Sequence, residues 1–283
     1  MKSAVFLIQA ADCKGLLAGI TSFFYRNSLN IVHCQQYTDP ISSHYFMRIK
    51  IDLADMQLTR RDLEGKFGEL AEELNLEWQV HYSDYIPKVA ILVTRTSHNL
   101  HDLLVKHQEG ELYCEIPLII SNHQHLEYMA DWFRIPFYCL PVTKDTKASQ
   151  ESQVMELLEK HHVDLVVMAR YMQILSEDFI KKYPLKIINI HHAFLPAFEG
   201  GNPYARAYER GVKMIGATAH YATVELDKGP IIEQDVVRID HEKTPDDLKR
   251  IGAEVERVVL TRAVKAHLEH RVMVHGHRVI IFN

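Results

Sequence analysis

Hydrophobic and polar positions divide the first part of the chain into six elements. Strand-like runs and amphipathic helical stretches follow in the order strand, helix, strand, strand, helix, strand. A turn at Asp12–Gly15 opens the first helix, which reaches about Arg26, and Thr59 is the expected N-cap of the second. The strands are expected at 4–9, 30–37, 45–52 and 77–82, with the second helix ending near 74. This order is typical of a ferredoxin-like sheet with two helices on one face.

The pattern changes after a polar stretch with a proline at 84–88, which we interpret as a linker. From there to residue 283, short apolar runs alternate with helical stretches, as in a Rossmann-like, doubly wound and mostly parallel sheet. A long helix is expected after Thr244, and a hairpin turning at His275-Gly276 ends the chain. The sheet strands are expected at 89–93, 117–121, 137–140, 163–169, 186–191, 217–223 and 231–237. We therefore predict an α/β protein with one domain at 1–83 and a second at 89–283.

Composition and charge exclude several classes of function. The net charge is −5 and no basic run stands out, so we expect no nucleic-acid partner. No segment approaches the roughly 20 apolar residues of a membrane span, and the N-terminal apolar stretch, broken by Asp12 and Lys14, is too short for a signal peptide. Four dispersed cysteines without a CxxC pair are typical of free thiols in a reducing cytosol. We expect a soluble cytoplasmic enzyme.

The end of one predicted strand carries the first candidate for chemistry. Asn189 and His191 lie two positions apart, so a strand places both side chains on one face. The carboxyl ends of parallel strands hold the active sites of open α/β sheets. An amide stabilises an oxyanion and an imidazole transfers a proton, so this pair suits a reaction at a carbonyl group.

Three blocks of sequence resemble the formyltransferases that use 10-formyltetrahydrofolate. The blocks are 189–196, 216–221 and 225–232. In that family an Asn, a His and an Asp form the catalytic set, and the matching motifs place these roles on Asn189, His191 and Asp227. The resemblance also implies a folate-binding segment after the fourth strand of the second domain. It implies further substrate-binding residues beside the catalytic set. The residues expected to bind substrate are Arg170, Tyr171, Met172, Ile174, Leu175, His220 and Thr223.

The ferredoxin-like domain narrows the resemblance to formyltetrahydrofolate deformylases, which hydrolyse the formyl group to formate. Residues 1–83 resemble an ACT domain, a module that usually binds small ligands, often amino acids, between two copies. The resemblance implies an amino-acid effector and a homo-oligomer, a dimer or tetramer; the alternative is a domain that only dimerises the enzyme. It implies no metal or redox cofactor, because the folate is the substrate. It also implies a role in supplying formate for purine synthesis and balancing one-carbon folate pools.

The turn after the first strand of the second domain favours water as the acceptor. The related glycinamide ribonucleotide transformylase binds its substrate's phosphate there in a Gly-Ser-Asn turn, and amides at a helix N-terminus bind anions. The equivalent stretch here, 94–99, has no glycine. Two other hypotheses stay open. One is formyl transfer to an amine on a nucleotide, a sugar or aminoacyl-tRNA, and the other is a non-enzymatic sensor of an amino acid or folate.

Under the hydrolase hypothesis, water attacks the formyl carbon on N10 of the folate. Asp227 orients His191, which protonates N10 as the C–N bond breaks, and Asn189 donates a hydrogen bond to the oxyanion. Whether His191 or Asp227 is the base stays open.

Three neighbouring features have simpler interpretations. His192 follows His191 directly, so strand alternation places it on the opposite face in a structural role, where the two cannot share a metal. His220 is expected to support Asp227, bind substrate or fill the core. The Gly200-Gly201 pair is expected to be a flexible loop before a helix that begins at Pro203.

Overall fold

The computed structural model describes residues 2–196 and 203–283, and the chain forms two compact units. The first unit consists of 1–86 with 270–273 and 280–283, and the second of 87–269 with 274–279. The expected Gly200-Gly201 loop lies outside the described residues.

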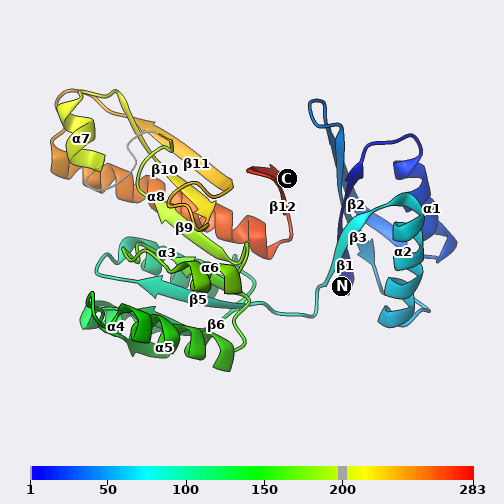
Figure 1. Cartoon of the computed structure of the whole chain (residues 1–283), viewed down its shortest axis with the longest axis horizontal. Helices are drawn as coiled ribbons and strands as arrows, with labels where there is room; N and C mark the ends of the chain where they lie inside the picture. Colours follow the sequence, from blue (N-terminus) through cyan, green and yellow to red (C-terminus); the bar gives the residue numbers. More distant parts are fainter. Residues whose placement is uncertain (1, 197–202) are drawn as a thin grey trace. The chain divides into compact units, whose positions relative to one another are not determined.

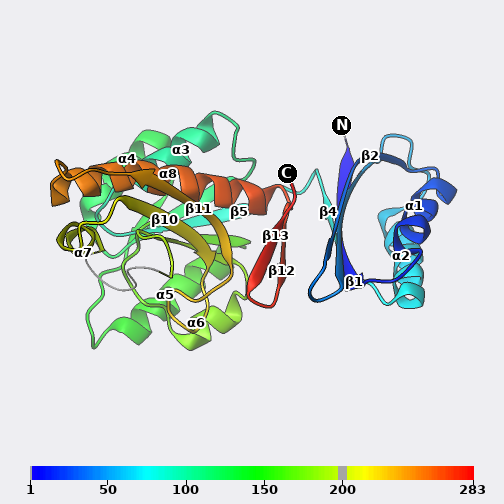
Figure 2. The same ribbon diagram turned by 90° about the horizontal axis from the view of Figure 1, so that it is seen from above.

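The first unit is a four-stranded antiparallel sheet in the order β2-β3-β1-β4. Both α1 and α2 cover the same face of this sheet (Figure 2). The predicted ferredoxin-like order is therefore confirmed, and Thr59 caps α2 by accepting a hydrogen bond from the Asp62 amide. The elements are β1 (Ser3–Ala11), α1 (Leu16–Arg26), β2 (Asn30–Asp39), β3 (His44–Asp52), α2 (Arg60–Leu74) and β4 (Glu77–Tyr82).

Each face of this sheet has its own hydrophobic core. On the helical face, the ring of Phe6 packs on those of Phe24 and Phe67, with centroids 5.2 and 4.8 Å away. On the other face, Met273 and Phe282 from the end of the chain complete a cluster with Val5, Leu7 and Phe46. The last residues of the chain therefore stabilise its first unit.

The second unit is built on a seven-stranded sheet in the order β11-β10-β9-β8-β5-β6-β7. The strands from β9 to β7 are parallel, and β10 and β11 are antiparallel additions at the β9 edge. The predicted doubly wound sheet is thus confirmed. The strands are β5 (Lys88–Val93), β6 (Glu115–Ser121), β7 (Phe137–Cys139), β8 (Leu165–Met168), β9 (Ile187–His191), β10 (Met214–Tyr221) and β11 (Ile231–Arg238).

Helices cover both faces of this sheet, with α3 and α8 on one side and α5 and α6 on the other (Figures 1 and 2). Thr244 forms a capping box with Asp247 at the start of α8, as the sequence indicates. The helices are α3 (His98–Gln108), the short 3₁₀ turn η1 (Gln124–Leu126), α4 (Glu127–Phe133), α5 (Lys147–Lys160), α6 (Glu177–Lys182), α7 (Pro203–Glu209) and α8 (Pro245–Leu268). Among the helices described, none is long and apolar enough to cross a membrane.

A hairpin of β12 (Val272–His275) and β13 (Arg278–Ile281) follows α8. The chain turns through Gly276 and His277, one residue later than predicted, and Gly276 has a φ of 60°. Glycine adopts this left-handed conformation without a steric penalty, so the turn begins at Gly276 and β12 ends at the residue before it.

Candidate active site

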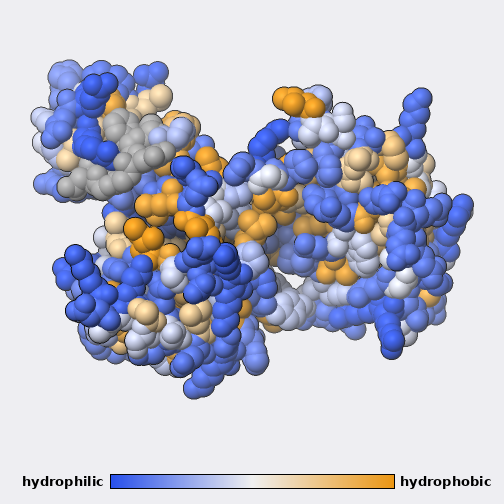
Figure 3. Space-filling view, viewed as in Figure 1, coloured by the Kyte–Doolittle hydropathy of each residue, from blue (hydrophilic) through white to orange (hydrophobic). Residues whose placement is uncertain are grey.

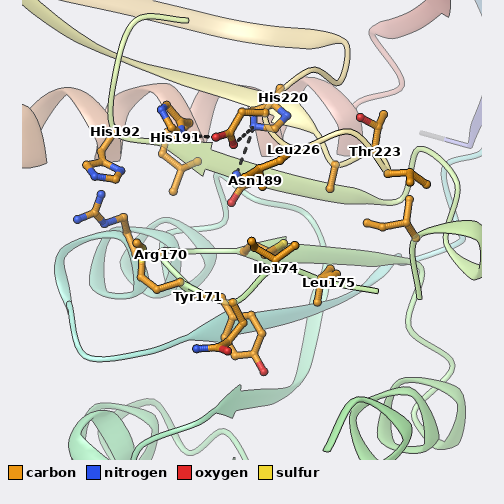
Figure 4. Close-up of a pocket in the computed structure, with 18 residues that line it drawn as sticks. Arg170, Tyr171, Ile174, Leu175, Asn189, His191, His192, His220, Thr223 and Leu226 are labelled. Carbon is orange, nitrogen blue, oxygen red and sulfur yellow. Dashed lines mark hydrogen bonds and ion pairs between the residues drawn. The ribbon is translucent and has the colours of Figure 1, made fainter. Parts of the chain in front are cut away.

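Two neighbouring strands carry the amide and the imidazoles of the site. Asn189 and His191 both line one pocket from the end of β9. On β10, His220 pairs directly with Asn189, and its Nε2 lies 3.3 Å from the Asn189 amide nitrogen. Figure 4 shows these side chains converging on the same end of the pocket. The period of two along β9 and the register of β10 therefore bring the three groups together.

Asp227 reaches this group from the turn after β10. Its Oδ2 lies 3.2 Å from Nδ1 of His191, and its Oδ1 lies 3.7 Å from Nε2 of His220. Gly229 makes the turn's close approach to β10 feasible, because a Cβ there would lie 1.7 Å from the Tyr221 carbonyl oxygen. The backbone at Asp227 is itself left-handed, with a φ of 57°. Aspartate adopts this conformation more readily than most residues, so the turn places a carboxylate beside the two imidazoles at little cost.

Hydrogen bonds fix the protonation of Asp227 and the orientation of its partners. The bond from His191, and then the proximity of His220, hold the pKa of the Asp227 carboxyl well below its usual range, so it is a carboxylate. A carboxylate only accepts, so Nδ1 of His191 carries the proton and Nε2 is the nitrogen left for chemistry. That Nε2 is buried and has no hydrogen-bond partner among the described residues.

His220 holds Asn189 in place. Its Nδ1–H donates to the Tyr221 carbonyl oxygen at 2.9 Å, so in the neutral ring Nε2 accepts from the Asn189 amide. The Asn189 amide group has two N–H donors. One is used by His220, and the other is left for a further acceptor next to His191.

Apolar side chains line the rest of the pocket, which has a volume of about 290 Å³. This is near the lower end of the range for small-molecule sites, about 300–1,000 Å³. Met172 and Ile174 are each 60% exposed on one wall, and Leu226 and Val224 are exposed on another part of the lining. In Figure 3 hydrophobic residues gather on this unit near β9 and α6. Such walls suit a flat aromatic ring system.

The segment that carries Met172 and Ile174 is anchored at both ends by α5. Gln150 Nε2 donates to the Tyr171 hydroxyl at 2.7 Å, and the Ser176 amide donates to Glu151 at 3.1 Å. Tyr171, expected to contact substrate, is 2% exposed and its side chain belongs to the core cluster of this sheet. Its position makes it an anchor for the exposed residues that follow.

All the positions expected to bind substrate line this pocket. They are Arg170, Tyr171, Met172, Ile174, Leu175, His220 and Thr223. The lining also includes residues that sequence reasoning did not select: Met168, Gln173, Ile180, Ile190, His192, Ala222, Val224 and Leu226.

His192 differs from its expected position. It lines the same pocket as His191, because β9 ends at His191 and strand alternation no longer applies to the next residue. Burial, and then the charge of Arg170, lower the pKa of His192 to about 3. His192 is therefore neutral, with its ring 5.8 Å from that of Tyr204. Among the described residues, no group of three or more His, Cys, Asp or Glu side chains is arranged to hold a metal.

Sequence reasoning missed one buried carboxylate near this end of the pocket. Glu256 on α8 is 2% exposed at its side chain and accepts hydrogen bonds from His98, at 2.9 Å, and from the Tyr204 hydroxyl, at 2.8 Å. Asn99 donates to it at 3.3 Å, and Nε of Arg170 lies 3.7 Å away. Burial opposes ionisation, but the His98 bond and the Arg170 charge outweigh it and lower the pKa of Glu256 to about 2.

The helix pattern around Glu256 holds the signal that identifies it. Leu248, Gly252, Glu256 and Leu260 are spaced four apart and are all buried on α8. A glutamate on a buried stripe requires partners. Gly252 provides the space for one of them, because a Cβ there would lie 2.0 Å from the Tyr204 hydroxyl.

Residues 87–264 match the family described as Formyl transferase, to which the chain therefore belongs. A curated relative from Synechocystis sp., named formyltetrahydrofolate deformylase, is 51% identical over 99% of this chain and 98% of its own length. A solved formyltetrahydrofolate deformylase from Pseudomonas syringae is 40% identical, with a TM-score of 0.97 over 100% of this chain and 95% of that one. Within the wider family, the chain belongs to the formyltetrahydrofolate deformylases.

The fold extends to enzymes with another acceptor. A glycinamide ribonucleotide transformylase from Symbiobacterium toebii is 27% identical, with a TM-score of 0.67 over 72% of this chain and 97% of that one. The catalytic unit is thus similar both to deformylases and to a transformylase, so side chains around the site must distinguish the two reactions.

Proposed function

We propose that this chain hydrolyses 10-formyltetrahydrofolate to formate and tetrahydrofolate at the pocket described above. One observation carries the proposal: Asn189, His191 and Asp227 lie within contact distance of one another, or of the shared partner His220, at one end of an apolar pocket. Membership of the deformylases supports the same substrate. The folate is the substrate, and the proposal includes no resident metal or redox cofactor.

The proposed mechanism uses Nε2 of His191 as the group that moves the proton. Nε2 takes a proton from the attacking water as the oxygen bonds to the formyl carbon, and the Asp227 carboxylate stabilises the imidazolium. Asp227 is a poor base by itself, because the bond from His191 and the nearby His220 hold its pKa so low. The second Asn189 N–H stabilises the tetrahedral oxyanion. His191 then gives the proton to N10 as the C–N bond breaks, and formic acid ionises to formate.

The apolar walls are proposed to hold the pteridine ring. Met172, Ile174 and Leu175 are on the segment fixed by α5, and Val224 and Leu226 belong to the turn that carries Asp227. Ring binding would therefore place the formyl group next to the catalytic set, because the same two segments contribute to both. Thr223 lines the pocket between them and is proposed as a polar contact to the substrate.

The first unit is proposed to be an ACT-like regulatory domain. Its βαββαβ order and the turn before α1, with Gly15 at a φ of 99°, support this assignment. We further propose that this domain binds an amino-acid effector and that the chain forms a homo-oligomer, either a dimer or a tetramer. The enzyme is proposed to act in the cytoplasm, where it supplies formate for purine synthesis. Formate release with and without individual amino acids tests the effector, and light scattering tests the oligomeric state.

One assay tests the reaction. The protein is incubated with 10-formyltetrahydrofolate, with or without glycinamide ribonucleotide, and formate and tetrahydrofolate are measured. Formate release without an amine is expected. Product that forms only with the amine would instead select a transferase, and no product in either case would select a sensor.

A further inference from the structure

The Arg170 side chain occupies an unusual place at the end of the pocket. It follows β8 directly, and its backbone φ is 65°, in the left-handed region that favours glycine. A side chain in this conformation costs on the order of 1–2 kcal/mol. The Arg170 side chain is nevertheless only 15% exposed and lines the pocket. Arg134 has a similar φ of 57° but an exposed side chain outside the pocket, so it is the combination of this conformation with a nearly buried, pocket-lining side chain that distinguishes Arg170.

Figure 4 shows the Arg170 guanidinium beside His192, at the end of the pocket away from Leu175 and Thr223. The apolar walls therefore lie toward one end of the pocket, and Arg170 and His192 lie at the other, past His191. A nucleophile larger than water would need room beside the formyl carbon. The guanidinium occupies part of the room at this end.

Glu256 holds Arg170 in this position. The carboxylate receives donors from the first turn of α3, through His98 and Asn99, and from α7, through Tyr204. Arg170 is its cationic partner, with Nε 3.7 Å from Oε2. Because Glu256 is almost fully buried and fixed by three other side chains, it is a rigid counter-charge that attracts the guanidinium to this end of the pocket, although Nε and Nη1 of Arg170 have no hydrogen-bond partner among the described residues.

We propose that Arg170, positioned by Glu256, is a specificity-determining residue that restricts the nucleophile to water. The inference rests on the proposed hydrolysis of a formyl folate. The chain shares its fold with a transformylase, so the scaffold itself is compatible with an amine acceptor. In this chain, the guanidinium at this end of the pocket leaves room for a water molecule beside the formyl carbon and excludes an amine with its carbon substituent.

The two reactions differ only in the nucleophile, so one experiment measures both. With water, the C–N10 bond breaks, a C–O bond forms, and the products are formate and tetrahydrofolate. With a primary amine, the nitrogen attacks the same carbon, its proton passes to N10, and the products are an N-formyl amine and tetrahydrofolate. No oxidant or reductant is needed, and the ratio of formyl amine to formate reports which nucleophile reaches the carbon.

The test uses the full chain, 10-formyltetrahydrofolate labelled with ¹³C in the formyl group, and glycinamide as the amine. The double variant R170G/E256Q removes the side chain, relieves the backbone and leaves no unpaired buried charge. The matched control is R134G, because Arg134 has a φ of 57° at the exposed end of α4, outside the pocket lining. The expected ratio of N-formylglycinamide to formate is unchanged in R134G and about tenfold or more higher in the double variant.

Several outcomes overturn the inference. One is a folded double variant that releases formate with the wild-type ratio. Another is a variant whose KM for the folate rises while the ratio stays constant, which would make Arg170 a substrate-binding residue. If the double variant does not fold, R170A supplies the same measurement, since Glu256 keeps His98, Asn99 and Tyr204 as partners. Failure of the proposed function is separate: the wild-type chain would then release no formate.

Discussion

The Asp227 carboxylate lies 3.2 Å from Nδ1 of His191, in a turn that follows a different strand. This contact depends on Gly229, which lets the turn approach the Tyr221 carbonyl more closely than any side chain would permit. The turn also carries Leu226, part of the apolar lining. One short segment thus orients the imidazole that is proposed to transfer the proton and contributes to the surface proposed to bind the folate.

Replacing Asp227 by Asn should lower kcat by about 10²–10⁴-fold, because the imidazolium formed during water attack loses its counter-charge. The shape of the side chain is kept, so the circular dichroism spectrum should match the wild type. The matched control is D235N, a partly exposed position on β11 outside the pocket lining that pairs with Arg262. Near-normal formate release by D227N would exclude the assigned role.

Replacing Asn189 by Ala removes the donor proposed for the oxyanion. The expected loss in kcat is about 10²–10³-fold, with a much smaller change in KM, because the hydrogen bond strengthens as charge develops. Steady-state kinetics separate the two parameters. A variant with a raised KM and an unchanged kcat would place Asn189 in substrate binding alone.

Much of the site follows from local rules that act within the sequence. A strand period of two places Asn189 and His191 on one face, and the resemblance to formyltransferases supplies Asp227. The register of β10, which sets His220 opposite Asn189, depends on pairing between strands and has no local signature. The same applies to Glu256, whose partners come from α3, from α7 and from the segment after β8.

Side-chain directions after a strand end are the part that spacing predicts least well. Arg170 and Met172 both have positive φ values, so strand alternation does not continue past β8, and Tyr171 lies in the core. His192 likewise lies beyond the last residue of β9, and the alternation that would place it opposite His191 does not continue. In both cases the sequence identifies the residue type, but the backbone conformation after the strand end sets the direction of the side chain.

The anchor of the segment that carries Met172 and Ile174, which is proposed to bind the folate, can be tested through Gln150. Replacing it by Leu leaves the buried Tyr171 hydroxyl without its donor, which should cost about 1–3 kcal/mol in the free energy of unfolding. The loosened segment should also raise the KM for the folate more than it lowers kcat. Urea denaturation and kinetics measure these effects, and S152A, on the exposed side of α5, is the control. An unchanged KM would separate the anchor from substrate binding.

His192 should make the second unit less stable in mild acid. Its pKa is about 3 when folded and near 6.5 when exposed, so the unfolded chain binds the extra proton between these values. Stability contributed by the neutral ring is therefore complete above about pH 6.5 and is lost as the pH falls toward 3. Replacing His192 by Asn should reduce the loss of unfolding free energy between pH 7 and pH 5 by on the order of 1 kcal/mol.

Urea titrations at the two pH values measure that difference, with the exposed His125 replaced by Asn as the control. An equal loss of stability in wild type and H192N would contradict a neutral buried ring. Because His192 does not titrate between pH 5 and 8, the apparent pKa on the acidic side of the pH dependence of kcat should also be unchanged in H192N.

Two glycine substitutions in helices should change stability in opposite directions. Alanine is the better helix former by about 1 kcal/mol. At Gly65, in α2, a new Cβ meets no atom within 4 Å, so G65A should raise the melting temperature of the first unit. At Gly252 the new Cβ would lie 2.0 Å from the Tyr204 hydroxyl, and the ring must move away from Glu256. Overpacking of this kind costs about 1–3 kcal/mol, which exceeds the gain in helix propensity.

The combination G252A/Y204A distinguishes a steric cause from a general effect on α8. Removing the ring removes the clash and leaves the gain in helix propensity, so the two substitutions should be strongly non-additive, and the double variant should be at least as stable as Y204A. Thermal unfolding followed by calorimetry resolves these differences. Additive effects would mean that Gly252 is needed for the helix itself, whereas the expected coupling shows that the glycine exists to let Tyr204 reach the buried carboxylate.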